Sequence, residues 1–174
     1  MNHGREARQL GTLYPRPEAP VTGILHAMDF NGRTLEHLSR DECLRLMGQV
    51  PLGRIVYTRQ ALPAVELVNF ALDDGDIIIR TDSSGKLAAA TRDAVVAFEV
   101  DSVDIATHAG WSVTIVGNSR AVADSEEIRR LEQVDLVPWA PGEHDHYIRI
   151  SPGIVHGRRV RSQPVTEVSD ASPV

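Results

Sequence analysis

The hydrophobic pattern changes its period once along the chain, and this change separates a leading helix from a run of strands. Ser39 can cap a helix, and Glu42, three residues later, can complete a capping box. Apolar residues follow at helical spacing as far as Pro51, which ends the helix. Beyond Pro51, β-branched and aromatic residues predominate, which predicts strands. We expect five of them, at 54–58, 64–72, 76–81, 94–100 and 111–122.

Turn residues and helix formers separate these strands. Gly75 lies in a compact turn and predicts an antiparallel hairpin between the second and third strands. The alanine-rich run 85–90 predicts a short helix, and a longer one follows Asp124 or Ser125 and ends before Pro138. The final segments, 146–150 and 154–160, predict a bent last strand that is broken at 151–153.

Six strands with three short helices at this spacing are typical of a mainly β domain, either a closed barrel or a sandwich. The folded unit spans residues 35–161 in this interpretation. Residues 1–34 contain three prolines and no sustained apolar period, which predicts an irregular N-terminal arm. Residues 162–174 also lack a period and are expected to form a flexible C-terminal tail.

Composition limits the classes of protein to which this chain can belong. The chain has 174 residues, the size of one ordinary domain. Its single cysteine, Cys43, has no partner for a disulfide within the chain, and we expect it to pack in the core. The net charge of −6 gives no footprint for nucleic acid. We find no apolar run that could span a membrane and no secretory signal, so we expect a soluble, cytoplasmic protein.

The turn Thr81-Asp82-Ser83-Ser84-Gly85-Lys86 carries the strongest chemical signal, because a strand ends there and a helix begins. Unpaired backbone N–H groups, the serine hydroxyls and the charge of Lys86 could together hold a phosphate. A serine cap on a surface helix with a solvated lysine explains the turn as well. The spacing of a nucleotide P-loop is absent.

The order of four segments, 63–70, 77–81, 84–87 and 110–117, resembles the pyridoxamine 5′-phosphate oxidase-like, FMN-binding split-barrel family, in particular its small actinobacterial-type members. The resemblance covers about residues 36–161. It implies a six-stranded antiparallel split β-barrel with short flanking helices. It also implies a homodimer that holds FMN, or in some branches the deazaflavin F420 or haem, at its interface.

The same resemblance implies a set of cofactor-binding residues. Residues Glu66, Leu67, Val68 and Asn69 would lie along the flavin ring. The phosphate or ribityl chain would meet Arg80 and Thr81, with Ser84, Lys86 and Leu87 at the helix start. Trp111 and Ser112 would approach from the partner chain.

Two departures from the family pattern affect the expected chemistry. Glu66 stands where many relatives place an arginine or another donor, and its carboxylate would repel a phosphate unless it pairs with Arg80 or with an arginine of the partner subunit. The cluster Arg158, Arg159 and Arg161 is basic but does not reproduce the substrate-phosphate cluster of the branch that oxidises pyridoxamine phosphate. We therefore do not expect vitamin B6 oxidation.

Other chemistry-bearing residues have alternative interpretations. His144 and His146 could approach a metal or simply begin a strand, and no third ligand is indicated, so no metal site is predicted. His108 could donate a proton near the cofactor or lie in a solvated loop. Trp139 could cover the cofactor pocket or the end of the barrel. No spacing predicts a hydrolase triad or a catalytic carboxylate pair.

The sequence therefore supports three functional hypotheses. The first is an FMN-dependent oxidoreductase that passes hydride from NAD(P)H through the flavin to a small organic acceptor, without an assigned catalytic acid or base. The second is a module that stores or senses a flavin, deazaflavin or haem without turnover. The third is a barrel that binds no cofactor.

Overall fold

The computed structural model describes residues 33–82 and 86–162, which form one antiparallel sheet of seven strands with three short helices. The strands are β1 (Arg33–Leu38), β2 (Leu52–Arg59), β3 (Leu62–Asp73), β4 (Asp76–Thr81), β5 (Ala94–Asp104), β6 (Ala109–Val122) and β7 (His146–Ser162). The helices are α1 (Arg40–Met47), α2 (Lys86–Ala90) and α3 (Ser125–Leu131).

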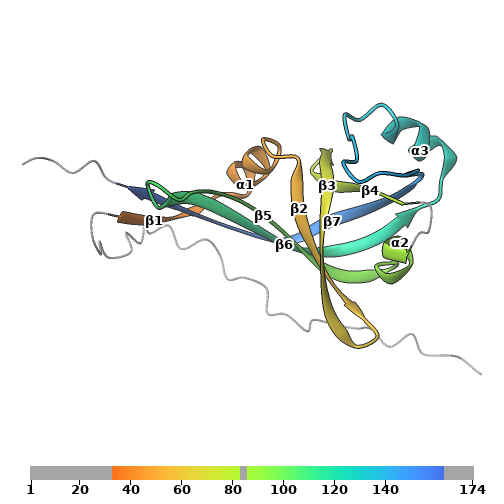
Figure 1. The fold of residues 1–174 in the computed structure, drawn as a ribbon, viewed down its shortest axis with the longest axis horizontal. Helices are drawn as coiled ribbons and strands as arrows, with labels where there is room; N and C mark the ends of the chain where they lie inside the picture. Colours follow the sequence, from red (N-terminus) through yellow and green to blue (C-terminus); the bar gives the residue numbers. More distant parts are fainter. Residues whose placement is uncertain (1–32, 83–85, 163–174) are drawn as a thin grey trace, which may run out of the picture.

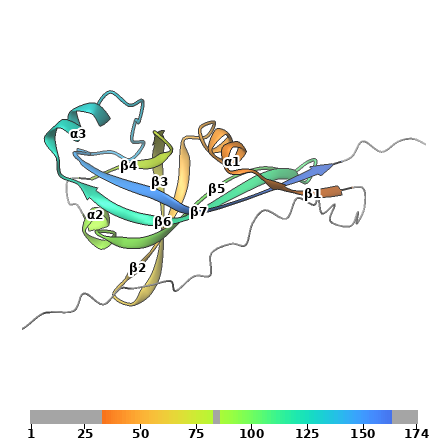
Figure 2. The same cartoon turned by 180° about the vertical axis from the view of Figure 1, so that it is seen from behind.

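The sheet closes on itself. Its order is β1-β7-β4-β3-β2-β5-β6, and β6 also pairs with β7. The strands β2 to β7 therefore form a ring, with β1 outside it along β7 (Figures 1 and 2). This arrangement confirms the predicted six-stranded antiparallel barrel and its flanking helices. None of the described helices is long and apolar enough to cross a membrane.

Two strands differ from the sequence-based expectation. Strand β1 was not predicted, because its side chains do not alternate in polarity and its order comes from pairing with β7, from Arg33↔Ser162 to Leu38↔Gly157. The predicted break in the last strand is wrong, since β7 is continuous. The register between β6 and β7 shifts between Val116 and Gly117 of β6, and this shift accommodates the Pro152 segment of β7 as a bulge. The expected arm and tail lie outside the described residues, apart from their innermost positions.

The core has two parts because β4 is covered on both faces. Ile77 and Ile79 face the barrel interior with Phe98 and Ile148. Ile78, between them, faces outward and packs in a second cluster with Val122 of β6, Leu131 of α3, Leu136 of the segment after α3 and Tyr147 of β7. Successive residues of a strand point to opposite faces, so an uninterrupted apolar run indicates a strand buried on both sides.

Helix α1 lies against β7 at a position where only glycine fits. A Cβ atom on Gly157 would overlap the sulfur of Cys43, which is fully buried in the barrel core. The backbone N–H of Glu42 donates to the Ser39 hydroxyl over 3.3 Å, as predicted for the cap. The Glu42 carboxylate, however, turns to Arg45 and Arg159, whose hydrogen bonds lower its pKa to about 2.

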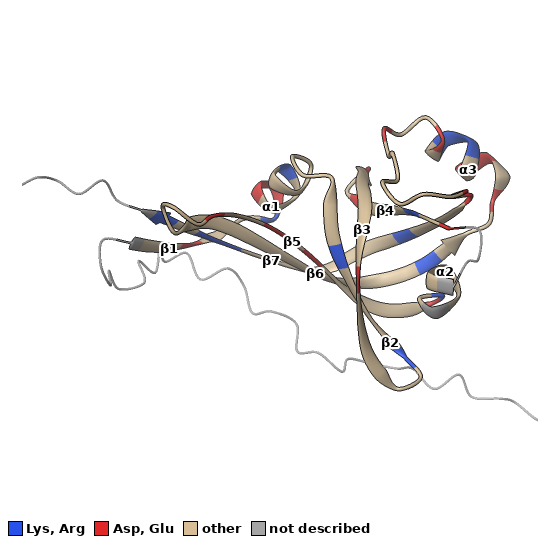
Figure 3. Ribbon diagram, viewed as in Figure 1, with Lys and Arg blue, Asp and Glu red and all other residues tan. Residues whose placement is uncertain are grey.

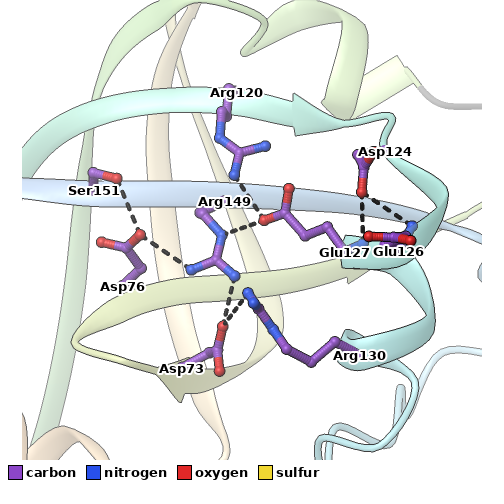
Figure 4. A network of polar contacts seen from close by, with 9 residues as sticks. All are labelled: Asp73, Asp76, Arg120, Asp124, Glu126, Glu127, Arg130, Arg149 and Ser151. Carbon is purple, nitrogen blue, oxygen red and sulfur yellow. Dashed lines mark hydrogen bonds and ion pairs between the residues drawn. The ribbon is translucent and has the colours of Figure 1, made fainter.

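A buried arginine ties α3 to the barrel (Figure 4). Only 7% of the Arg149 side chain on β7 is exposed, and its guanidinium reaches three carboxylates. The distances are 2.6 Å to Asp73 and 3.1 Å to Asp76, at the two ends of the β3–β4 turn, and 2.7 Å to Glu127 on α3. Because these three carboxylates belong to separate elements, the single cation fixes the β3–β4 hairpin and α3 on β7.

The network lowers the pKa of two of its acids. Hydrogen bonding from Arg149 holds the pKa of Asp73 below its ordinary value. For Glu127 the largest cause is the hydrogen bond from Arg120, and Arg149 adds to the decrease. A carboxyl group whose pKa is lowered by folding stabilises the folded state above its unfolded pKa of about 4. That stabilisation disappears as the pH falls through the folded-state pKa.

Replacing Arg149 by methionine should destabilise the fold by about 3 kcal/mol at neutral pH, because three partly buried carboxylates lose their shared cation. Urea denaturation followed by circular dichroism measures this change. The difference between the wild type and Arg149→Met should shrink below about pH 4, where the acids become protonated.

The control for this experiment is Arg129→Met, which removes an exposed ion pair in which the Arg129 guanidinium lies 3.8 Å from the Glu126 carboxylate. Its expected effect is below about 0.5 kcal/mol. Equal destabilisation by the two variants, or a difference that does not depend on pH, would contradict the assigned role of Arg149.

Candidate functional site

An opening in the barrel lies where β3 and β4 diverge. Strand β3 pairs with β2 from Leu62 to Asn69, but with β4 only from Phe70↔Ile79 to Asp73↔Asp76. Within the described part of the chain, residues 62–69 of β3 have no strand partner on the β4 side. Alternate backbone N–H and C=O groups along this edge are available to a ligand with donors and acceptors of its own.

A cleft adjoins this free edge of β3. Its volume is about 380 Å³, and it brings together Glu66 from β3, Thr81 from β4 and Leu87 from α2, three residues that the sequence analysis singled out. The remaining lining residues are Tyr57, Arg59, Asp82 and Ala89. The cleft is polar at the strand ends and apolar against the buried side chain of Leu87.

Glu66 accepts a short hydrogen bond from the phenolic hydroxyl of Tyr57. This bond raises the pKa of Tyr57, and burial of the phenol adds to the increase. The Tyr57 ring itself is buried in the barrel core, so it holds the carboxylate at the barrel side of the cleft. Glu66 thus has a partner within the same chain that the sequence analysis did not consider.

Arg80 and Thr81 lie on opposite faces of β4. Thr81 is buried and lines the cleft. Arg80 donates from Nε to the carbonyl of His144 over 2.5 Å and its guanidinium lies 5.5 Å from the centre of the Tyr147 ring. Adjacent residues of a strand cannot point to one face, so only Thr81 of this predicted pair reaches the cleft.

The ring-side residues predicted on β3 also alternate. Leu67 is 61% exposed on the outer surface, whereas Val68 packs against the core. The Asn69 side chain accepts a hydrogen bond from the backbone of Trp139 over 2.8 Å. Its amide nitrogen is 3.4 Å from the carbonyl oxygen of Pro51. Backbone contacts to a ligand remain available along the strand, but these side chains face different surroundings.

The predicted phosphate turn is only partly described. Ser83, Ser84 and Gly85 lie outside the described residues, as does the side chain of Lys86. Lys86 is the first residue of α2, so the predicted strand-to-helix transition is confirmed.

Trp111 and Ser112 lie in a different depression. They line an apolar hollow of about 520 Å³ beside the β5–β6 turn, with His108 and Arg158 among the other lining residues. The β5–β6 turn and α2 lie at opposite ends of the molecule (Figure 1). One chain therefore does not bring Trp111 and Ser112 to the cleft that contains Thr81.

The histidines considered as functional candidates do not line the cleft. The Nδ1 atom of His144 is 3.0 Å from the carbonyl oxygen of Gly142, and His146 begins β7. His108 occupies the β5–β6 turn with a φ of 53°. Residues 33–82 and 86–162 contain no cluster of three or more potential metal ligands.

Sequence reasoning missed Tyr57 and Arg59 as cleft residues, because the tight turn that positions them has no glycine. Gln60 and Ala61 both adopt positive φ, at 51° and 63°, which non-glycine residues rarely do. Only the register Tyr57↔Ala64 across this turn reveals that the phenol lies diagonally next to Glu66. The positive-φ pair leaves no recognisable signal in the residue types.

Comparison with known proteins identifies relatives for most of the chain. The family profile described as pyridoxamine 5′-phosphate oxidase matches residues 39–159. An uncharacterized protein of Mycobacterium tuberculosis is 38% identical over 143 residues, which cover 79% of this chain and 93% of the relative.

Solved structures show the same fold. The FAD binding protein from Mycobacterium smegmatis is 32% identical, with a TM-score of 0.61, over 71% of this chain and 96% of that protein. A protein of unknown function from Corynebacterium diphtheriae matches at 30% identity and a TM-score of 0.61 over the same shares. The FAD and heme binding protein from Mycobacterium smegmatis is 14% identical, with a TM-score of 0.59 over 72% of this chain and 73% of that protein, and shows a likeness of fold alone.

Proposed function

This chain belongs to the pyridoxamine 5′-phosphate oxidase family, and we propose that it is a flavin-dependent oxidoreductase that holds its cofactor against the free edge of β3. The observation that carries the proposal is the combination of this unpaired edge with the adjoining cleft. The relative from Mycobacterium smegmatis at 32% identity is named as an FAD binding protein, which supports a flavin as the ligand.

The chemistry of the edge suits the ring of a flavin. An isoalloxazine ring has a polar pyrimidine edge with both donors and acceptors and an apolar benzenoid end. Backbone groups of residues 66–69 would meet the polar edge, and the exposed side chain of Leu67 offers apolar surface nearby. Ring placement thus depends on the backbone, which explains why these four side chains can face different surroundings.

The phosphate end of the cofactor is expected at the start of α2. Thr81 and Leu87 line the cleft there, and Ser84 and Lys86, which lie between them in the sequence, remain the proposed phosphate ligands. Arg59 contributes a cation at the hairpin side of the same cleft. Arg80, whose guanidinium lies on the other face of β4, is not needed as a direct phosphate ligand in this arrangement.

The proposal includes a homodimer, which would bring Trp111 and Ser112 of a second copy to the ring. Apolar residues cover the outer face of neighbouring strands: Val65, Val56 and Ala97 are aligned across β3, β2 and β5, and Val65 is 60% exposed. The projecting β2–β3 hairpin is mostly free of charged positions (Figure 3). An apolar sheet face of this kind is typical of a subunit interface.

A bound flavin supplies the reversible acceptance of a hydride, which we propose comes from reduced nicotinamide and passes to a small organic acceptor. The residues of this chain bind and orient the ring and exclude water from it. Hydride transfer itself requires no proton from the protein, which agrees with the lack of an assigned catalytic acid. Storage of a flavin, deazaflavin or haem without turnover is the second candidate, favoured by Glu66 in the cleft and by the named binding function of the relative.

Titration of the purified protein with riboflavin, FMN and FAD tests the proposal. We expect saturable binding of at least FMN or FAD, bleaching of the visible flavin band by NADH or NADPH, and recovery only with an added acceptor. Bound flavin that neither nicotinamide reduces would support storage instead. A protein that binds none of the three and whose melting temperature they leave unchanged would contradict the proposal.

Two variants, one in the cleft and one at the first residue of α2, should change FMN affinity in opposite directions. Glu66→Gln removes a carboxylate near the proposed phosphate site and should tighten FMN binding by about 1 kcal/mol, roughly fivefold. Lys86→Ala removes a charge-assisted hydrogen bond and should weaken FMN binding by about 1.5 to 3 kcal/mol. Fluorescence titration measures both affinities.

Riboflavin, which lacks the phosphate, is the control ligand, and Glu126→Gln in the exposed first turn of α3 is the control variant. Lys86→Ala should not alter riboflavin affinity, and the control variant should alter the affinity of neither ligand. Unchanged FMN affinity in Lys86→Ala would place the phosphate elsewhere.

The dimer has its own test. The wild-type particle should have twice the chain mass of 19.1 kDa, and Val65→Asp should yield folded monomer because a charge would then be buried in the interface. Sedimentation equilibrium measures the mass. Ala123→Asp, at an exposed position between β6 and α3, should remain dimeric. A monomeric wild type would remove Trp111 and Ser112 from the proposed site.

A further inference from the structure

The segment between α3 and β7, residues 132–145, is held on the outer face of the β3–β4 hairpin by two hydrogen bonds from the sheet. Asn69 on β3 accepts from the backbone N–H of Trp139 over 2.8 Å. Arg80 on β4 donates to the backbone carbonyl of His144 over 2.5 Å. Both bonds use side chains of the sheet and backbone atoms of the segment, so they fix the path of the segment whatever its side chains do.

Asn69 and Arg80 mark the point where the two strands diverge. The last pair in register on that side is Phe70↔Ile79, and Asn69 and Arg80 follow one residue further on each strand. Side chains at such opposed positions lie on the same face of a sheet. The segment is therefore attached directly beside the beginning of the free β3 edge.

The attached segment exposes two large apolar side chains. Leu136 is buried against α3 and β4 and anchors the segment. Val137 and Trp139, in contrast, are 66% and 64% exposed. A single exposed apolar residue is ordinary, but an exposed indole on a backbone tied to the end of the proposed ring site is well placed for a ligand.

We infer that Trp139 forms one wall of the flavin site and contacts the planar ring, and that Asn69 and Arg80 are positioning residues that act through the 132–145 segment. The inference rests on the proposed flavin function and deepens it. It assigns indirect roles to two residues whose family positions suggest direct cofactor contact. It also assigns a direct role to an exposed tryptophan of the same subunit.

The physical requirement is a flat, rigid and polarisable surface next to the ring. An indole provides this surface with only two rotatable side-chain bonds to order, and aromatic pairs contribute attraction beyond the apolar area that they bury. The same contact requires that the backbone of Trp139 be fixed before the ligand arrives, since ordering a free loop would oppose binding.

Riboflavin binding by the full-length protein, measured by quenching of flavin fluorescence, tests the inference. Riboflavin is neutral and has no phosphate, so its affinity reports on the ring alone. Trp139→Ala should weaken its binding roughly tenfold, and Trp139→Phe should retain most of the affinity. Val137→Ala is the matched control on the same exposed stretch and should bind as the wild type does.

The positioning role requires a second set of variants. Asn69→Ala should weaken riboflavin binding about as much as Trp139→Ala, and the double variant should be no weaker than either single variant, because the two changes remove one effect. Asn69→Asp keeps an acceptor for the Trp139 N–H and should restore binding. Rescue by aspartate distinguishes the hydrogen bond from a general loss of packing.

Several outcomes would overturn the inference while leaving flavin binding intact. If Trp139→Ala binds riboflavin as tightly as the wild type does, Trp139 does not contact the ring. Additive losses in the double variant, or failure of Asn69→Asp to restore binding, would remove the positioning role. If instead the wild type binds no riboflavin, FMN or FAD, the proposed function itself fails and this inference fails with it.

Discussion

Four residue pairs between β3 and β4 are the constraint on which the site depends. Strand β3 extends far beyond β4 and stays paired with β2, so the barrel is closed at one end of β3 and open along the other. Longer pairing would cover the free edge with backbone, whereas shorter pairing would leave the β3–β4 hairpin without enough hydrogen bonds to remain in the ring. The opening is therefore a feature of strand length and register.

Buried charge compensates for the shortness of this pairing. Arg149 binds the carboxylates at both ends of the β3–β4 turn and extends to Glu127 on α3. The same helix buries Leu131 over the outer face of β4, where Ile78 lies. Electrostatic and hydrophobic contacts thus hold α3 at one place, and the position of α3 sets where the following segment crosses the sheet. By positioning α3, the Arg149 network thus determines which groups lie next to the cleft, although the network itself is not part of the cleft.

The two faces of the sheet contribute different residues to the proposed site. The inner face and the cleft present Tyr57, Glu66 and Thr81. The outer face holds the 132–145 segment through Asn69 and Arg80. Because adjacent strand residues alternate between these faces, a family pattern that treats residues 80 and 81 as one ligand pair combines a cleft residue with a residue that acts on a neighbouring loop.

The sequence by itself determined the strand positions of the ring, the Ser39 cap of α1 and the family, because periodicity and capping depend on residues close together in the chain. It also pointed to Thr81, Glu66 and Leu87, which the fold brings into one cleft. Only the tertiary structure decided that β1 joins β7, that Tyr57 holds Glu66 and that Asn69 and Arg80 bind backbone atoms 64 or more residues away. These contacts depend on register, on a turn whose non-glycine residues adopt positive φ, and on the crossing of a distant segment, none of which is encoded in the local pattern of polar and apolar residues.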